Sequence, residues 1–201
     1  MAIKINLQET EQELFCCSKW WGDPDLPPDM EYPLAPAEED GESFYYPLTF
    51  VCQIDMADVA PLDQEGLLPH EGMMYVFAGL DEYLNLDSPW HNGTGQWDRK
   101  QVVIKYTKSI NMETFRSAML VDDDDQSLTT PALKMTFEAC PDDAPCTRLL
   151  GVSAEAGQVP FLHIASGTAG LQFPGQGALQ LSWSETDHAK AIWKRIIATL
   201  K

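Results

Sequence analysis

Short apolar runs separated by turn-rich stretches predict several strands. Residues 133–138 alternate Leu133, Met135 and Phe137 with polar neighbours, as a half-buried strand does. Five prolines between positions 24 and 36 exclude a helix there and favour an extended loop. The other predicted strands, which are rich in β-branched and aromatic residues, are 48–54, 73–77, 102–106, 160–164 and 178–183.

Three segments carry the pattern of helices. Acidic residues lead the segment 9–17, and Asn111 is placed to cap a helix through Leu120. The clearest helix follows Ser184, because an apolar stripe at helical spacing runs to the end of the chain. The stripe consists of Ala189, Ile192, Trp193, Ile196, Ile197 and Leu200. The pattern as a whole predicts an α+β fold: a mostly antiparallel sheet with a C-terminal amphipathic helix.

Two segments share a strand–loop–strand plan, which predicts an internal duplication. Aligning Gln53-Ile54 with His163-Ile164 brings a glycine, Gly72 or Gly177, to the head of each second strand. The repeat units span about residues 47–84 and 159–200, within one domain covering residues 1–201. Chance similarity between two ordinary hairpins is the alternative explanation.

The charge is strongly acidic, with 31 Asp and Glu against 13 Lys and Arg, a net charge of −18. Such a surface repels nucleic acids and anionic membranes, so neither is expected as a partner. It attracts a basic protein, although solubility alone is an alternative role for the charge. No apolar run is long enough to span a membrane, and the start of the chain lacks the pattern of a secretory signal. With an odd number of cysteines, five, we expect free thiols and a cytoplasmic location.

The motifs of common catalytic and metal sites are incomplete. The four histidines are scattered, and Cys140 and Cys146 have no second pair at zinc-ligand spacing. The acidic run 122–125 fails as an EF-hand, since Ser127 and Leu133 stand where glycine and glutamate are needed. A segment resembling a nucleophile elbow at 151–155 ends in glutamate. We therefore expect no catalytic residue, metal or cofactor, and we interpret His163 as a hydrogen-bonded core residue. Trp20, Trp21, Trp90 and Trp97 flank loops, where they would line a ligand site or cap the sheet.

Several segments resemble one family. Segment 18–27 is similar to its opening motif, a Lys followed by Gly-Gly, a Pro and a Leu-Pro. Segment 47–55 is similar to its strand that begins with Pro-Leu and ends in Gln-Ile-Asn or Gln-Ile-Asp, and segment 72–77 to its Gly-x-Leu-x-Phe-Phe strand. Residues 149–151 and 160–164 are similar to its later motifs. The chain thus resembles the YwqG-like family, bacterial proteins with a domain of unknown function. The resemblance implies a sheet-rich, duplicated fold and supplies no reaction. Two departures stand out: Trp21-Gly22 replaces Gly-Gly, and His163-Ile164-Ala165 replaces the second Gln-Ile-Asp.

These observations favour a non-enzymatic protein that binds another, basic protein, with an immunity-type role against a toxin as one form. The residues expected to form the binding site are Lys19, Trp20, Trp21, Gly22, Gln53 and Asp55. One alternative is a hydrolase-like enzyme with carboxylates and a histidine in a pocket near Gln53 and Asp55. The other is a structural scaffold, which predicts neither pocket nor partner.

Overall fold

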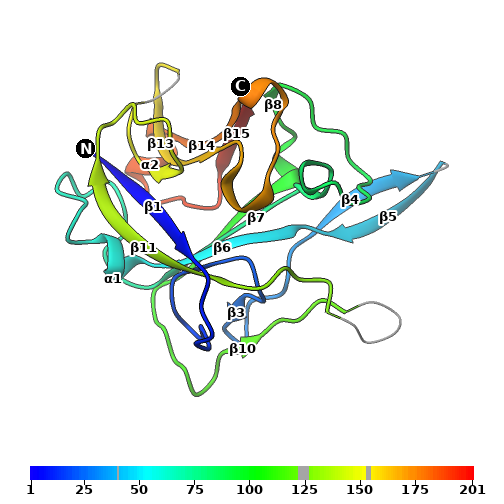
Figure 1. Cartoon of the computed structure of the whole chain (residues 1–201), viewed down its shortest axis with the longest axis horizontal. Helices are drawn as coiled ribbons and strands as arrows, with labels where there is room; N and C mark the ends of the chain where they lie inside the picture. The colour runs from blue at the N-terminus through cyan, green and yellow to red at the C-terminus, as the bar shows by residue number, and fades with distance from the viewer. Residues whose placement is uncertain (40, 122–126, 153–154) are drawn as a thin grey trace.

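The computed structural model describes residues 1–39, 41–121, 127–152 and 155–201. In these ranges the main feature is an antiparallel sheet of eleven strands that curls into a half-barrel (Figure 1). From edge to edge its strands are β8 (Gly95–Gln96), β15 (Ile196–Leu200), β14 (Ala178–Ser184), β13 (Gln158–Ala165), β12 (Arg148–Leu149), β1 (Ala2–Gln8), β11 (Leu133–Cys140), β2 (Lys19–Trp20), β6 (Thr49–Asp55), β7 (Met73–Ala78) and β9 (Val102–Thr107).

Two small strand pairs accompany the main sheet. The hairpin β4 (Leu34–Glu39) and β5 (Glu42–Pro47) projects away from the half-barrel, as Figure 1 shows. Strand β3 (Asp25–Leu26) pairs with β10 (Arg116–Ser117), which joins segments that are distant along the chain. The proline-rich stretch is thus extended, as predicted, and part of it forms strands.

The expected α+β fold is wrong, because the chain is mostly β, with 40% of residues in strands and 11% in helices. The described residues contain two short α-helices, α1 (Met56–Val59) and α2 (Glu185–Ala189). The predicted helices at 9–17 and 111–120 do not form. Single-turn 3-10 helices complete the structure: η1 (Asp81–Leu84), η2 (Arg99–Gln101), η3 (Thr168–Gly170) and η4 (Pro174–Gln176).

The C-terminal helix is the largest error. Ser184 caps α2 by accepting a hydrogen bond from the Asp187 N–H, as its spacing suggested, but α2 ends at Ala189. Ala191 has a left-handed backbone conformation, with φ of 52°, which a helix does not allow. The last residues then form β15, in which Ile196, Ala198 and Leu200 are buried and alternate with less buried neighbours. Two residues of the predicted helical stripe, Ile196 and Leu200, also fit this strand period of two.

The core lies on both faces of the β6–β7 pair. All six residues of β7 are buried, and they alternate between two clusters. Met74 and Val76 join the larger cluster, while Tyr75 and Phe77 face a smaller one that includes Leu26 of β3. Because directly paired residues lie on the same face of a sheet, Gln53 of β6, which pairs with Tyr75, also faces β3.

The two halves of the sheet show matching pairings on either side of the central β1–β11 pair. Beyond β2 come β6, β7 and β9, and beyond β12 come β13, β14 and β15. After β2, Trp21 has φ of 59° and donates to Val51 O, and after β12, Leu150 has the same φ and donates to Phe161 O. These matches support the pseudo-repeat, which stays a prediction, as does the single domain. No helix among the described residues is long and apolar enough to cross a membrane.

Candidate functional site

Two of the expected binding residues, Lys19 and Gln53, meet at a buried carboxylate, Asp25. Strand β2 places Lys19 directly opposite Gln53 of β6, and both side chains point toward β3. Lys19 Nζ lies 2.7 Å from Asp25 Oδ2, and Gln53 Nε2 donates to the same oxygen at 2.8 Å. The Asp25 side chain is fully buried, and that of Lys19 is 6% exposed. A buried carboxylate needs such a countercharge, since an isolated one would be very costly.

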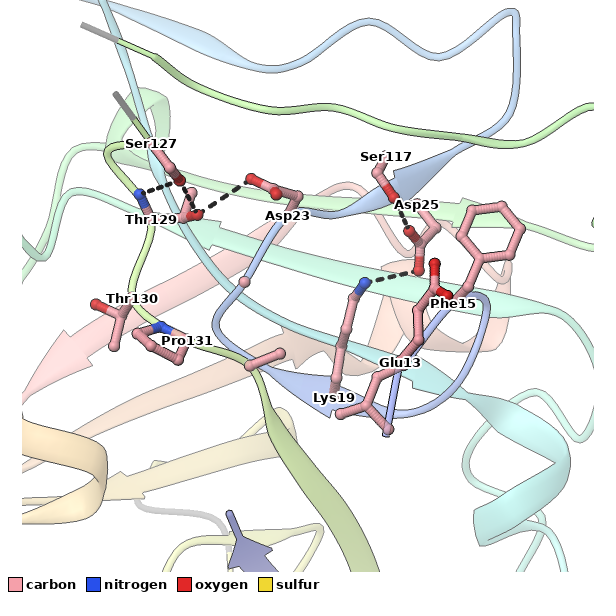
Figure 2. A pocket seen from close by; sticks show the side chains of 13 residues that line it. Glu13, Phe15, Lys19, Asp23, Asp25, Ser117, Ser127, Thr129, Thr130 and Pro131 are labelled. Carbon is pink, nitrogen blue, oxygen red and sulfur yellow. Dashed lines mark hydrogen bonds and ion pairs between the residues drawn. The ribbon is translucent and has the colours of Figure 1, made fainter. Parts of the chain in front are cut away.

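Further donors complete the hydrogen bonding of Asp25. The Cys16 N–H donates to Oδ2 and the Ser117 hydroxyl to Oδ1 (Figure 2 shows Ser117 and Lys19 on the carboxylate). The Tyr75 hydroxyl donates to the Asp25 carbonyl oxygen, and the Asp25 N–H donates to Gln53 Oε1. Asp25 therefore joins β2, β6, β7 and β10 in one buried polar network.

Burial changes the chemistry of the groups around this network. Desolvation, with a smaller contribution from the Asp25 carboxylate, raises the pKa of the Cys16 thiol to about 11. Desolvation likewise raises the pKa of the Tyr75 hydroxyl far above its ordinary value. Both groups stay protonated at neutral pH, so neither acts as an anionic nucleophile there.

A hollow of about 330 Å³ opens beside the Lys19–Asp25 pair (Figure 2). Its floor and rim come from the loop before β2, the β2–β3 turn, β10 and the segment 127–132. The Thr129 hydroxyl donates to Asp23 Oδ1 at 3.2 Å and lies 2.8 Å from the Ser127 hydroxyl. The polar residues that line the hollow are Glu13, Lys19, Asp23, Asp25, Ser117, Ser127, Thr129 and Thr130.

This lining is acidic and rich in hydroxyls. Three carboxylates face one ammonium group, and that ammonium is already paired with Asp25. Asp23 is half-buried and accepts a hydrogen bond from Thr129, and Glu13 is exposed at the rim; neither carboxylate forms an ion pair within the described part of the chain. Serine and threonine hydroxyls both donate and accept hydrogen bonds. Chemically, the hollow suits a cationic, hydrogen-bonding group.

The other expected site residues lie in structural positions. Trp20 is fully buried in the larger core cluster, and Trp21, 3% exposed, donates through Nε1 to Ala169 O. Gly22 lines the hollow with φ of 75°, and a Cβ atom there would meet Ala132 Cβ at 2.8 Å. Asp55 caps α1 by accepting from the Ala57 N–H, and desolvation raises the pKa of its carboxyl. Of the six residues, the structure thus brings Lys19, Gln53 and Gly22 to the Asp25 site.

The second half of the sheet presents different groups at the matching positions. Arg148 of β12 pairs with His163 of β13, as Lys19 pairs with Gln53. The guanidinium of Arg148 donates to the carbonyl oxygens of Asp142, Ala144 and Cys146, and it pairs with no carboxylate among the described residues. His163 Nδ1 lies 3.1 Å from Gln180 Oε1, as expected for a hydrogen-bonded core histidine. Burial, and secondarily Arg148, lowers the pKa of His163.

The remaining tryptophans near loops also serve packing. Trp90 is buried and donates through Nε1 to Pro36 O, which anchors the projecting hairpin. Trp97 stacks on Tyr83 with ring centroids 5.8 Å apart. Among the described residues there is no cluster of three or more His, Cys, Asp or Glu that could hold a metal ion. The acidic run 122–125 lies outside the described residues.

Residues 18–188 match the family described as Domain of unknown function (DUF1963), and the chain belongs to this family. Comparison with curated proteins finds no match to this chain. The matched region begins at Ser18, directly before Lys19, and includes Asp25, Gln53 and Ser117.

Asp25 is the residue that the sequence did not single out. Asp25 lies six residues after Lys19, inside the opening motif. Its position in that motif was the feature of the sequence that could have identified it as a site residue. Nothing in the sequence indicated that Ser117 and the hydroxyl groups of segment 127–130 belong to the site. Their contacts with it join residues that are 92 or more positions apart along the chain.

Proposed function

We propose that this protein is a non-enzymatic binding protein that recognises a basic partner protein. In this proposal, the hollow beside Lys19 and Asp25 accepts a lysine or arginine side chain of the partner. The observation that carries the proposal is the lining of the hollow, in which Glu13 and Asp23 accompany four hydroxyl groups around an already neutralised ion pair. An ammonium or guanidinium group offers several N–H donors and a positive charge, which match these acceptors.

The net charge supports the same kind of partner. A charge of −18 steers a basic protein toward the surface and accelerates the encounter, and salt screens this effect. An immunity-type role against a basic toxin is one form of this function. The proposal also includes membership of the YwqG-like group, which is a finer grouping than the matched family. It includes a cytoplasmic location as well. The five cysteines are free thiols, as they would be in a reducing compartment.

The alternatives receive less support. A hydrolase built on Asp55 would need that carboxylate free in a cleft, but Asp55 caps α1 and does not line the hollow. His163 belongs to the other half of the sheet, where it contacts Gln180. A pure scaffold predicts no pocket, in contrast to the hollow found beside Asp25.

The test is a binding titration with short unstructured peptides rich in lysine or arginine, at low and at high salt. We expect binding that weakens steeply with salt. We also expect the Asp23→Asn and Glu13→Gln variants to bind about tenfold more weakly than wild type. A charge-assisted hydrogen bond contributes about 1.5–3 kcal/mol, and less when it is partly exposed. Calorimetry or fluorescence anisotropy measures the affinity.

The matched control is Asp143→Asn, which removes the same charge at an exposed position outside the hollow. If the Asp23 and Asp143 variants weaken binding equally, the attraction comes from net charge alone and the site is wrong. If no basic peptide binds wild-type protein at low salt, the proposed function is wrong.

A further inference from the structure

A second pocket, of about 280 Å³, lies beside the hollow and shares Gly22, Thr129 and Thr130 with its lining. Its volume is near the lower end of the range of about 300–1,000 Å³ that is usual for small-molecule sites. Unlike the hollow, it has mainly apolar and aromatic walls, which include Trp21, Tyr32, Tyr46, Leu48, Phe50 and Leu84.

The carboxylate of Asp81 is set into this apolar lining. Asp81 begins η1 shortly after β7 and is 8% exposed. Thr49 of β6 donates its hydroxyl to Asp81 Oδ1 at 2.6 Å, and the Leu86 N–H donates to the Asp81 carbonyl oxygen. The ends of β6 and β7 thus hold a buried carboxylate at the wall of the pocket.

This carboxylate has no countercharge in the part of the chain that the structure describes. No Lys, Arg or His there lines the pocket or forms an ion pair with Asp81, and Oδ2 has no hydrogen-bond partner there. Burial raises the pKa of the Asp81 carboxyl, and the bond from Thr49 opposes this rise. Asp25, in contrast, is paired with Lys19. A buried carboxylate is costly unless it is paired, so a cation that enters the pocket would be stabilised beside Asp81.

The mouth of the pocket exposes large apolar side chains to water. Leu86 and Leu128 line the pocket and are 56% and 60% exposed. Leu120, which also lines it, stands between Met119 and Val121, both of which are exposed. Exposed apolar side chains that gather in one place are typical of ligand-binding grooves. The ligand that fits this pocket therefore has an apolar body as well as a positive charge.

We propose that this pocket binds a small amine, in which a protonated primary amino group is attached to a compact apolar body. The ammonium group donates a hydrogen bond to Asp81 Oδ2, and the body packs against the aromatic and leucine side chains of the walls. This site is separate from the proposed recognition of a basic protein, because the hollow that would receive a lysine or arginine has a mainly polar lining.

The first test is a titration of the ¹⁵N-labelled protein with benzylamine and with benzyl alcohol, which has the same ring but no charge. With millimolar benzylamine we expect shifts of the backbone amides of Thr49, Asp81, Leu84 and Leu86. We expect benzyl alcohol to bind at least about tenfold more weakly, because it leaves the buried carboxylate unpaired. Equal affinities, no shifts at these residues, or shifts centred on Glu13 and Ser117 in the hollow would each overturn the proposal.

The second test removes the charge of Asp81. Asp81→Asn keeps an oxygen that can accept from Thr49, and it should fold because it removes an unpaired buried charge. We expect it to bind benzylamine at least about tenfold more weakly than wild type and to bind benzyl alcohol equally well. The matched control is Asp143→Asn, which removes the same charge at an exposed position outside the pocket and should retain wild-type affinity for benzylamine.

Equal affinities of the two variants for benzylamine would overturn the proposal. If Asp81→Asn fails to fold, the comparison of amine and alcohol on the wild-type protein decides the matter. Asp81→Asn should also bind lysine-rich peptides as wild type does, since Asp81 does not line the hollow. Failure of this inference and failure of the proposed function therefore give different results.

Discussion

Replacement of Lys19 by methionine should strongly destabilise the fold, because it leaves the Asp25 carboxylate buried without a countercharge. Lys19 Nζ lies 2.7 Å from Asp25 Oδ2, and the two side chains are 6% and 0% exposed. Removal of one partner of a buried ion pair costs about 3–5 kcal/mol, a large part of the total stability of about 5–15 kcal/mol. The hydrogen bonds from Gln53 and Ser117 to the carboxylate would remain, but they do not neutralise it.

Urea unfolding followed by tryptophan fluorescence measures this loss as a lower transition midpoint. Lys4→Met is the control, since Lys4 forms an ion pair with Glu138 at the exposed surface, where such pairs contribute little. The double variant Lys19→Met/Asp25→Asn should be more stable than Lys19→Met alone by about 1–3 kcal/mol, because it contains no unpaired charge. If Lys19→Met is as stable as Lys4→Met, the reasoning about the buried pair is refuted.

Two further variants test the backbone and the second half of the sheet. Gly22→Ala should lower the free energy of unfolding by about 1–3 kcal/mol more than Gly66→Ala does. Both glycines have positive φ, but only at Gly22 would an added Cβ meet Ala132 closely. Equal losses of unfolding free energy in the two variants would contradict this prediction. Burial lowers the pKa of His163, so its stabilising effect is present above its ordinary pKa and is lost as pH falls. The midpoint of His163→Gln should therefore fall less than that of wild type between about pH 6.5 and 5, and parallel pH profiles would refute the assignment.

The interior strands could be predicted from sequence because burial on both faces leaves a dense apolar signal. The predictions at 48–54 and 73–77 are confirmed by β6 and β7. Strand β1 was not predicted, although Ile3, Ile5 and Leu7 alternate with polar neighbours as a half-buried strand does. The C-terminal error arose because Ile196 and Leu200 satisfy both a helical period and a strand period. Pairing with β14 favours the strand over the helix, and the local sequence does not reveal that contact.

The candidate site was predictable in part for the same reason. Lys19 and Gln53 came from motifs and do meet, because β2 and β6 are neighbours in the sheet. Trp20 and Trp21 were predicted to flank a loop beside the proline-rich stretch. Both are in fact in the core, Trp20 in β2 and Trp21 directly after it. The hydroxyls of Ser117 and Thr129 reach the site through long-range pairing of β10 with β3 and through the approach of segment 127–132.

The most direct test of the account is an NMR titration of the ¹⁵N-labelled protein with a lysine-rich peptide and with the same peptide acetylated on every lysine. The account predicts salt-sensitive shifts of the backbone amides around the hollow, at Glu13, Asp23, Thr129 and Ala132, with the lysine peptide and none with the acetylated one. Shifts scattered over the acidic surface, or equal shifts with both peptides, would contradict the proposal that this hollow receives a basic side chain.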